Sequence, residues 1–224
     1  MAGNAKYKLN EDFFDVIDSE EKAYVLGWFY SDGCVNVLGK MRIQIQAEDR
    51  AVLELIKKIM GYTGPLYEIP PPKKFPHRKA QVCLTMNRKR TADKLIELGC
   101  TPNKSLTVSM PTKDQVPPKF FSHFIRGVFD GDGGVRIKKG KYLEAAITST
   151  NIFLQPLRNY LLKRHKIETK HYYRYSYTNT MMMMTTKTDH SRRFLNWIYK
   201  DSHFYLTRKK EIFDKYLEEV YNIV

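Results

Sequence analysis

The chain has 224 residues, of which 42% are hydrophobic, and carries a formal net charge of +14. That hydrophobic fraction excludes an intrinsically disordered chain, and the excess of Lys and Arg over Asp and Glu predicts a polyanionic partner, with nucleic acid the leading candidate. The basic residues are spread along the sequence rather than gathered on one amphipathic helix, which argues against binding to an anionic membrane surface.

The cysteines and the apolar segments limit the compartment. The sequence has three cysteines, Cys34, Cys83 and Cys100. Because their number is odd and no CxxC pair occurs, they predict neither a disulfide framework nor a zinc site. The sequence contains no apolar run long enough for a signal peptide core or a membrane span. We therefore expect a soluble, intracellular protein that is not secreted, located in a prokaryotic or phage cytoplasm or in an organelle.

A predicted helix near the N-terminus, within residues 20–35 (EEKAYVLGWFYSDGCV), has a second copy later in the chain. The copy is residues 120–135, FFSHFIRGVFDGDGGV. The residues that recur 100 positions later are Gly27, Phe29, Asp32, Gly33 and Val35. Self-similarity at a fixed spacing indicates a duplicated unit.

The same order of predicted elements follows each copy. After the first come two strands within 34–46, a helix over 47–61, strands at 64–69 and 79–86, and a helix over 88–99. After the second come two strands within 134–149, a helix over 151–165, strands at 169–178 and 181–188, and a helix over 189–200. Basic stretches, 101–108 and 202–213, end the two series. The sequence therefore predicts an α+β protein of two αββαββα halves, residues 1–105 and 119–224, joined by a linker at 106–118.

Small residues form a stripe along each repeated helix. At i, i+4 spacing the first helix carries Ala23, Gly27 and Ser31, and the second carries Gly127 and Gly131. Glycine inside a helix costs about 1 kcal/mol, so a gain from close packing must offset it. We expect the two helices to pack on each other around a pseudo-twofold axis.

This packing would bring Asp32 and Asp132 together, each at the C-terminal end of its helix. An acid there is unfavourable by roughly 0.3–1 kcal/mol, because that end of the helix dipole is negative, and neighbouring carboxylates also repel. Magnesium would relieve both effects, since Mg²⁺ binds one or two carboxylates and fills its other positions with water and substrate phosphate. An EF-hand loop is excluded because Lys141 stands at the twelfth position, where glutamate is required; a plain turn after each helix is the alternative.

Residues 25–33 (VLGWFYSDG) and 125–133 (IRGVFDGDG) resemble the nine-residue motif of the LAGLIDADG homing endonucleases, in their single-chain form with two motifs. The predicted order of strands and helices extends this resemblance to nearly the whole chain. Two residues depart from the motif: Tyr30 replaces its first acid in the first copy, and Arg126 replaces a small residue in the second. The resemblance implies that Asp130 belongs to the structure of the helix end and is not a metal ligand.

The resemblance also implies roles for particular side chains. Asp32 and Asp132 match the family's metal-binding acids, which implies two or three divalent ions, expected to be Mg²⁺, shared between these aspartates and DNA phosphates. The basic residue near the end of each half matches Lys104 and Lys209, with Arg208 as the substitute for the latter. The water-ordering polar residues match Gln46 in the first half and Ser149 or Thr148 in the second. The implied catalytic set is Asp32, Asp132, Lys104, Lys209 and Gln46.

Polar side chains on the predicted strands are suited to DNA. In residues 41–46, Arg42, Gln44 and Gln46 alternate with apolar residues and so share one face. Arg pairs with guanine, and Gln or Asn with adenine, in the major groove; an ordinary wet outer face is the alternative. Basic loops are better suited to phosphate. The predicted DNA-binding residues are Asn36, Lys40, Arg42, Gln44, Gln46, Lys73, Lys74, Arg78, Gln81, Arg136, Lys138, Lys139, Lys141 and Arg174.

The sequence and the resemblance together predict a monomeric, metal-dependent endonuclease. Its two sheets would form a saddle over double-stranded DNA, and it would hydrolyse phosphodiester bonds at a long pseudo-palindromic site. The alternatives on the same fold are an RNA maturase, with its own intron RNA as a further partner, and a DNA-binding regulator that does not cleave. Because the sequence begins with Met and ends in YNIV, we expect an independent protein rather than the nuclease of an intein.

Overall fold

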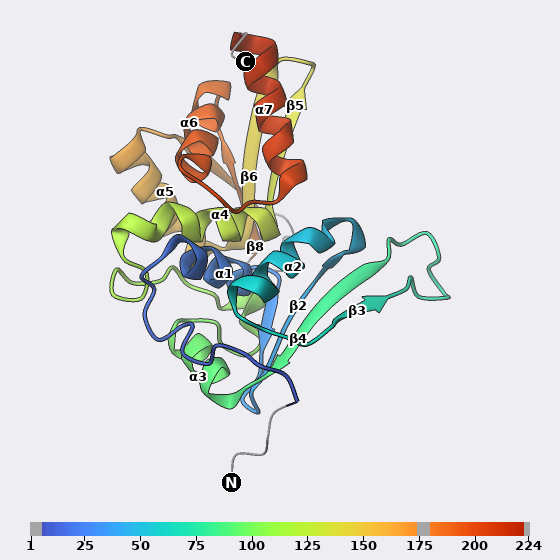
Figure 1. Ribbon diagram of the computed structural model, residues 1–224. Coiled ribbons are helices and arrows are strands. Elements are labelled where there is room, and N and C mark those ends of the chain that lie inside the picture. The colour runs from blue at the N-terminus through green and yellow to red at the C-terminus, as the bar shows by residue number, and fades with distance from the viewer. Residues whose placement is uncertain (1–5, 174–179, 222–224) are drawn as a thin grey trace.

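The computed structural model describes residues 6–173 and 180–221, which form two similar series of elements (Figure 1). The first series is α1 (Glu20–Tyr30), β1 (Gly33–Val35), β2 (Lys40–Gln46), α2 (Arg50–Ile59), β3 (Leu66–Ile69), β4 (Gln81–Asn87) and α3 (Lys89–Glu97). The second is α4 (Phe121–Asp132), β5 (Gly133–Lys138), β6 (Tyr142–Thr150), α5 (Asn151–His165), β7 (Thr169–Tyr173), β8 (Thr180–Thr185), α6 (Thr188–Tyr199) and α7 (Thr207–Tyr221). Short 3₁₀ turns lie at Ala47–Asp49, Lys104–Leu106 and Pro118–Phe120.

The order αββαββα is confirmed in both series, but the second continues into α7, which the sequence analysis treated only as a basic stretch. The apolar side chains of α7 face the protein, and Phe213 and Tyr216 are buried. In the first series the corresponding segment is only the 3₁₀ turn at Lys104–Leu106. The two halves therefore share their first seven elements and differ after them.

Each half contributes one antiparallel sheet of four strands. The strand orders are β1-β2-β4-β3 and β5-β6-β8-β7, so the two sheets have the same topology. Along β2 the side chains alternate as predicted. Met41, Ile43 and Ile45 are buried beneath the helices, and Arg42 and Gln44 are on the opposite, half-exposed face. This alternation gives each sheet one face for the core and one face for a partner.

Helices α1 and α4 cross at the centre of the molecule, between the two halves (Figure 1). A Cβ atom added at Gly27 would lie 2.8 Å from the Cα of Gly127, and one added at Gly127 would lie 2.9 Å from the Cα of Gly27. The two contacts mirror each other, as a twofold arrangement requires, and they leave no room for a side chain at either glycine. The predicted packing of the small-residue stripes is thus confirmed.

Helix α1 is buried on all sides. Every residue from Ala23 to Tyr30 is buried, which is typical of a helix at the centre of a core rather than on its surface. The side chain of Ser19 caps its N-terminus by accepting a hydrogen bond from the Lys22 backbone N–H, at 3.3 Å. No helix in the described part of the chain has the length and apolar character needed to cross a membrane.

Candidate active site at the ends of the paired helices

The C-terminal ends of α1 and α4 lie side by side. A Cβ atom added at Gly131, near the end of α4, would lie 3.1 Å from the Asp32 Oδ2 atom, so the carboxylate that follows α1 is beside the end of α4. Asp132 is the last residue of α4 and, like Asp32, has an exposed side chain. The structure therefore brings the two motif acids to one place.

The environment of Asp32 disfavours its negative charge. Although its side chain reaches solvent, protein surrounds most of the carboxylate, and this burial raises its pKa above the ordinary value. The neighbouring carboxylate of Asp49 raises the pKa further, while the ammonium groups of Lys209 and Lys104 oppose the rise without cancelling it. A bound cation would relieve this unfavourable charge.

Two buried lysines hold the ends of the motif helices. Lys104 is 7% exposed and donates a hydrogen bond of 2.9 Å to the Ser31 carbonyl oxygen, at the end of α1. Lys209 is 4% exposed and donates to three backbone carbonyl oxygens at the end of α4: those of Phe129 at 2.7 Å, Asp130 at 2.7 Å and Gly133 at 2.6 Å. Each ammonium thus offsets the negative end of a helix dipole, which is the feature that makes an acid unfavourable there.

Burial also changes the protonation of these lysines. It lowers the pKa of Lys209 to about 8, against the opposing influence of Asp130 and of both motif acids. Burial likewise lowers the pKa of Lys104, which is again opposed by the charges of Asp132 and Asp32. The two lysines and the two acids therefore form one electrostatic unit.

Arg208, the predicted substitute for Lys209, is placed differently. Its guanidinium contacts the carboxylate of Asp49, with Nε 2.9 Å from Oδ1 and Nη2 2.9 Å from Oδ2. Asp49 is 8% exposed and follows β2, so this pair joins the second half of the chain to the first. The sequence analysis did not single out Asp49.

The predicted water-ordering residues are not equivalent in the two halves. Gln46 ends β2 and its side chain is exposed. Gly33 pairs with Ile43 and Gly133 pairs with Ile147, so the strand register places Gln46 and Thr150 at corresponding positions. Ser149 and Thr148 lie one and two residues before Thr150 on β6, and each is only half-exposed.

Asp130 and Tyr30, the two first-acid positions of the motifs, are buried beneath the site. Asp130 accepts hydrogen bonds of 2.8 Å from the Tyr24 hydroxyl, 2.8 Å from the Leu206 N–H and 3.3 Å from the Tyr199 hydroxyl. Burial raises the pKa of Asp130, although Lys209 and these donors oppose the rise. With its lone pairs engaged inside the protein, Asp130 supports the helix end, as the resemblance implied.

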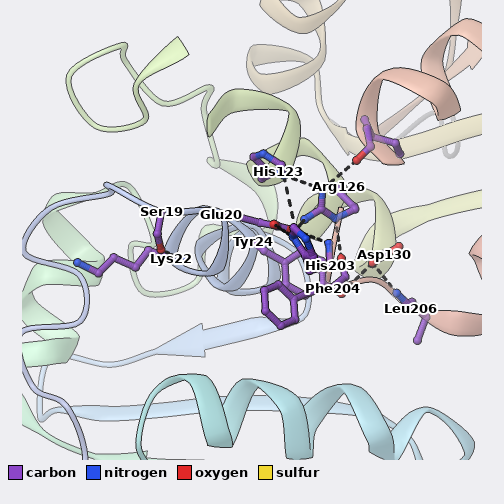
Figure 2. A network of polar contacts seen from close by, with 11 residues as sticks. Ser19, Glu20, Lys22, Tyr24, His123, Arg126, Asp130, His203, Phe204 and Leu206 are labelled. Carbon is purple, nitrogen blue, oxygen red and sulfur yellow. Dashed lines mark hydrogen bonds and ion pairs between the residues drawn. The ribbon is translucent and has the colours of Figure 1, made fainter. Parts of the chain in front are cut away.

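Arg126, the other departure from the motif, organises a buried network between the halves (Figure 2). Its guanidinium is fully buried and donates to the carbonyl oxygens of Phe204 at 2.7 Å and Ile198 at 2.9 Å, and to Glu20 Oε1 at 2.6 Å. The Glu20 carboxylate also accepts the His203 backbone N–H at 2.9 Å. No local sequence pattern indicates this network, because its partners are far apart in the chain.

The outer face of the first sheet carries several of the predicted DNA-binding residues. Arg42 Nε donates to Cys83 Sγ at 2.9 Å, and hydrogen bonds connect Arg42 to Gln44 and Gln44 to Gln81. Asn36 instead uses its Oδ1 atom to hold the β1–β2 turn. Elsewhere in this half, exposed basic side chains lie at Lys40 and in the β3–β4 loop, at Lys73, Lys74 and Arg78.

The outer face of the second sheet differs by carrying an acid. Glu144 Oε2 accepts from Arg136 at 2.6 Å, and Lys138 Nζ lies 3.4 Å from Oε1. Glu144 was missed, although its place in the alternating pattern of β6 puts it on the polar face. Lys139 and Lys141 are exposed at the β5–β6 turn, and Arg174 lies outside the described residues.

The residues at the helix ends suit a hard divalent cation. Asp32 and Asp132 offer carboxylate oxygens, and Mg²⁺ or Mn²⁺ accepts one or two of these while water and phosphate complete its coordination. The described residues contain no cluster of three or more His, Cys, Asp or Glu side chains placed to hold a metal ion.

Comparison with known proteins agrees with the fold and the motif. Residues 120–220 match the sequence profile of a LAGLIDADG-like domain, whereas no curated protein sequence matches the chain. The homing endonuclease I-WcaI bound to its DNA recognition sequence is similar in structure, with a TM-score of 0.64 and 13% identity, covering 95% of this chain and 94% of that one.

Two further solved structures show the range of proteins with this fold. DUF199/WhiA from Thermatoga maritima has a TM-score of 0.55 and 19% identity, covering 96% of this chain and 66% of that one. I-DmoI in complex with DNA and Mn has a TM-score of 0.51 and 13% identity, covering 83% of this chain and 98% of that one. The chain thus has the fold of these proteins throughout, and its second half matches a LAGLIDADG-like domain.

Proposed function

We propose that the protein is a site-specific, double-strand DNA endonuclease that works as a single chain and depends on a divalent cation, with Mg²⁺ the first candidate. The observation that carries this proposal is the position of Asp32 beside the end of α4, which Asp132 terminates. Structures similar to this chain include homing endonucleases solved with DNA, one of them with Mn. Nothing in a purely structural role requires two exposed acids at these helix ends.

In the proposed reaction Asp32 and Asp132 would hold divalent cations, and these would supply electrostatic stabilisation of the charge that develops at the phosphate. Gln46, exposed at the end of β2, positions the attacking water by a hydrogen bond. Lys104 and Lys209 hold the helix ends, and so fix the acids, through the backbone of the segments that carry them.

The two sheet faces and their loops position the DNA. In the proposal, the residues that read base edges in the major groove are Arg42, Gln44 and Gln81 in the first half, and Arg136 and Lys138 in the second. The remaining proposed contacts are sequence-independent bonds to phosphate. They are made by Lys40, Lys73, Lys74, Arg78, Lys139 and Lys141, all exposed. Arg174 remains a proposed contact from the sequence alone.

Digestion of a randomised DNA library in the presence of Mg²⁺ or Mn²⁺ tests this function. We expect the wild-type protein to cut both strands of a small set of related sequences, and EDTA to stop the reaction. Asp132→Asn should retain binding to the same sequences and lose cutting by at least about 10²-fold, since an electrostatic contact at the reacting centre is worth that much. Equal cutting by the variant would remove Asp132 from the active site.

A second function is suggested by the structural similarity to DUF199/WhiA, which extends over 96% of this chain. The chain would then be a DNA-binding protein that uses the two sheet faces without cleaving. The same library distinguishes the two functions, because tight binding with no cutting by the wild type in either metal would favour the binding protein.

A further inference from the structure

A cavity of about 580 Å³ lies between helix α5 and the segment that joins the two halves. Met110 and Val116 of the joining segment, Phe121 at the start of α4, and Pro156 and Tyr160 of α5 contribute its apolar walls. None of the proposed nuclease residues belongs to its lining. Cavities of this size with mainly apolar walls are typical of ligand sites and of the places where a partner inserts an anchoring side chain.

Hydrogen bonds hold the joining segment in place as one wall of this cavity. The Thr112 N–H donates to Gln115 Oε1 at 2.9 Å, and the Val116 N–H donates to the Thr112 carbonyl oxygen at 3.0 Å. Gln115 Nε2 donates in turn to the Glu97 carbonyl oxygen at 2.9 Å, which attaches the segment to the end of α3. The wall is therefore preformed, and a ligand binds without first having to order it.

Two cations and no acid belong to the lining. Lys113 of the joining segment and Arg164 of α5 are both exposed, and neither forms an ion pair within residues 6–173 and 180–221. His165 also lines the cavity, but burial and the charge of Arg164 lower its pKa, so it adds no charge near neutral pH. The cavity therefore suits a ligand that has an apolar part with negative charge beside it.

Helix α5 presents one continuous face to this cavity. Pro156, Tyr160 and Arg164 share that face because they are four residues apart, and Ile152, which precedes them at the same spacing, is 58% exposed. Pro156 lies inside the helix, where it cannot donate the backbone hydrogen bond that the Ile152 carbonyl oxygen would otherwise accept. The cavity thus continues along α5 as an apolar face with a backbone acceptor, which suits a peptide better than a compact small molecule.

We propose that this cavity and the adjoining face of α5 bind an acidic segment of a partner protein, which inserts an apolar side chain while its carboxylates pair with Lys113 and Arg164. The inference goes beyond the proposed nuclease function and does not depend on it. Helix α5 packs on the inner face of the second sheet, opposite the polar outer face proposed for DNA. In Figure 1 α5 is at the left of the view and the β3–β4 loop at the right. The partner and a DNA duplex can therefore bind together.

Selection from short random peptides displayed on phage tests the proposal. The full chain is immobilised, and excess duplex DNA is present to occupy the sheet faces. We expect the enriched peptides to carry Asp or Glu beside Phe, Leu or Trp, and labelled synthetic copies to bind the protein in solution. Enrichment of no peptide above an empty support, or of basic peptides, would overturn the proposal.

Pro156→Glu is the decisive variant, because it adds a negative charge to the cavity wall at an exposed position. It also replaces a residue that is unfavourable inside a helix, so the variant should fold. Its affinity for the synthetic peptides, measured by fluorescence anisotropy, should fall by at least about tenfold, as for a contact at the centre of an interface. Gln155→Glu is the matched control, since it adds the same charge at the neighbouring exposed position outside the cavity. Equal affinities of the two variants would overturn the proposal.

The pairing with cations has a separate test. Arg164→Ala should weaken the same peptides by about threefold or more and make their affinity less sensitive to salt, because a charge pair is lost. Lys163→Ala is the control, since Lys163 is exposed beside Arg164 in the sequence but does not line the cavity. Equal effects of the two variants would reflect only the net charge of the protein and contradict the assigned role of Arg164.

A single-stranded nucleic acid is the competing occupant, because Lys113 and Arg164 could also pair with phosphate. Labelled oligothymidylate is therefore titrated against Pro156→Glu and Gln155→Glu. We expect both variants to bind it alike, and we expect it to leave a bound peptide in place. Weaker binding by Pro156→Glu, together with displacement of the peptide, would make the cavity a nucleic-acid site and overturn the peptide assignment.

Discussion

At the scale of single residues, the first-acid positions of the two motifs, Tyr30 and Asp130, support the helix ends from inside the protein and leave the exposed acids unchanged. Tyr30 donates its hydroxyl proton to the Leu98 carbonyl oxygen, whereas Asp130, at the matching position, accepts hydrogen bonds, one of them from the Leu206 N–H. The two residues thus tie the motif helices to later segments with opposite hydrogen-bond polarity. Neither is near enough to solvent to act on a substrate, since they are 4% and 1% exposed.

Glu20 should stabilise the fold in a manner that depends on pH. Burial alone would raise its pKa, but hydrogen bonds from His203 and the charge of Arg126 outweigh burial and lower the pKa below the ordinary 4.5. A carboxylate with a lowered pKa contributes stability that is present above 4.5 and is lost as the pH falls through its folded-state pKa. Glu20→Gln should therefore cost about 3 kcal/mol at pH 7, because it leaves the buried charge of Arg126 without its partner.

Thermal unfolding followed by circular dichroism between pH 7 and pH 3 checks this prediction. The difference in Tm between wild type and Glu20→Gln should be large at pH 7 and should shrink as the pH falls below about 4.5 and through the lower folded-state pKa of Glu20. Glu21→Gln is the matched control, in the same turn of α1 but outside the network. A Tm difference that stays constant across this range would contradict the role of the Glu20 charge.

Glu144 should tune how the second sheet reads DNA. It holds Arg136 and Lys138, which are otherwise exposed, so it limits their attraction to any phosphate and orients Arg136. Glu144→Gln should raise affinity for random duplex DNA and reduce preference for the selected duplex by up to about tenfold, since one oriented Arg–guanine pair is worth about 1–3 kcal/mol. Competition binding with the two duplexes measures this.

The control for Glu144 is Glu218→Gln, which makes the same change of charge on an exposed position of α7. If both variants shift the two affinities alike, the effect is one of net charge, and the proposed orientation of Arg136 by Glu144 is wrong.

At the scale of elements, the crossing of α1 and α4 depends on glycine. A Cβ at Gly27 would lie 2.8 Å from both the Gly127 Cα and the Val128 N, and these are backbone atoms that cannot move aside alone. Gly27→Ala should therefore lose about 3 kcal/mol of unfolding free energy through overpacking, despite the better helix propensity of alanine. Urea denaturation checks this, with Gly134→Ala as the control because a Cβ there meets no atom within 4 Å. Equal stability of the two variants would contradict the tight crossing.

Much of the element pattern could be predicted from the sequence, because it follows from local periodicity and from duplication. The small-residue stripes indicate which faces of α1 and α4 are buried, and the alternation in β2 indicates which face of the first sheet is buried. Helix α7 was not predicted as a helix. Its sequence, TRKKEIFDKYLEEVY, has apolar residues at helical spacing, but its many charged residues make it look like a basic surface stretch. Phe213 is buried because α7 packs against the rest of the protein, and helix propensity alone does not determine that packing.

The site could be predicted only in part, for the same reason. The motif itself identifies Asp32 and Asp132, and the repeat places them at equivalent helix ends. Lys209 donates three hydrogen bonds at the end of α4, and Lys104 donates one at the end of α1. These contacts depend on where distant segments of the chain approach each other. Local sequence patterns carry no information of that kind, and the same holds for the pairing of Arg208 with Asp49.

At the scale of the whole molecule, the excess of positive charge predicts how binding responds to salt. The chain has 38 Lys and Arg against 24 Asp and Glu. A protein making six to ten phosphate contacts loses roughly 10³- to 10⁵-fold in affinity for duplex DNA between about 50 and 200 mM salt. We expect a loss of that size for this protein in a fluorescence anisotropy titration. An affinity that stays flat across the range would rule out a phosphate-binding surface of the proposed extent.

Two ion pairs across the halves, Arg126 with Glu20 and Arg208 with Asp49, flank the crossing of the motif helices. Together with the mirrored glycine contacts they hold the two halves, and so the two acids, in one relative position. The most direct test of the account is therefore where a metal binds. Crystals of the protein with its selected duplex and Mn²⁺ should show anomalous density in contact with the carboxylates of both Asp32 and Asp132. Density bound elsewhere, with these carboxylates free of metal, would contradict the proposed active site.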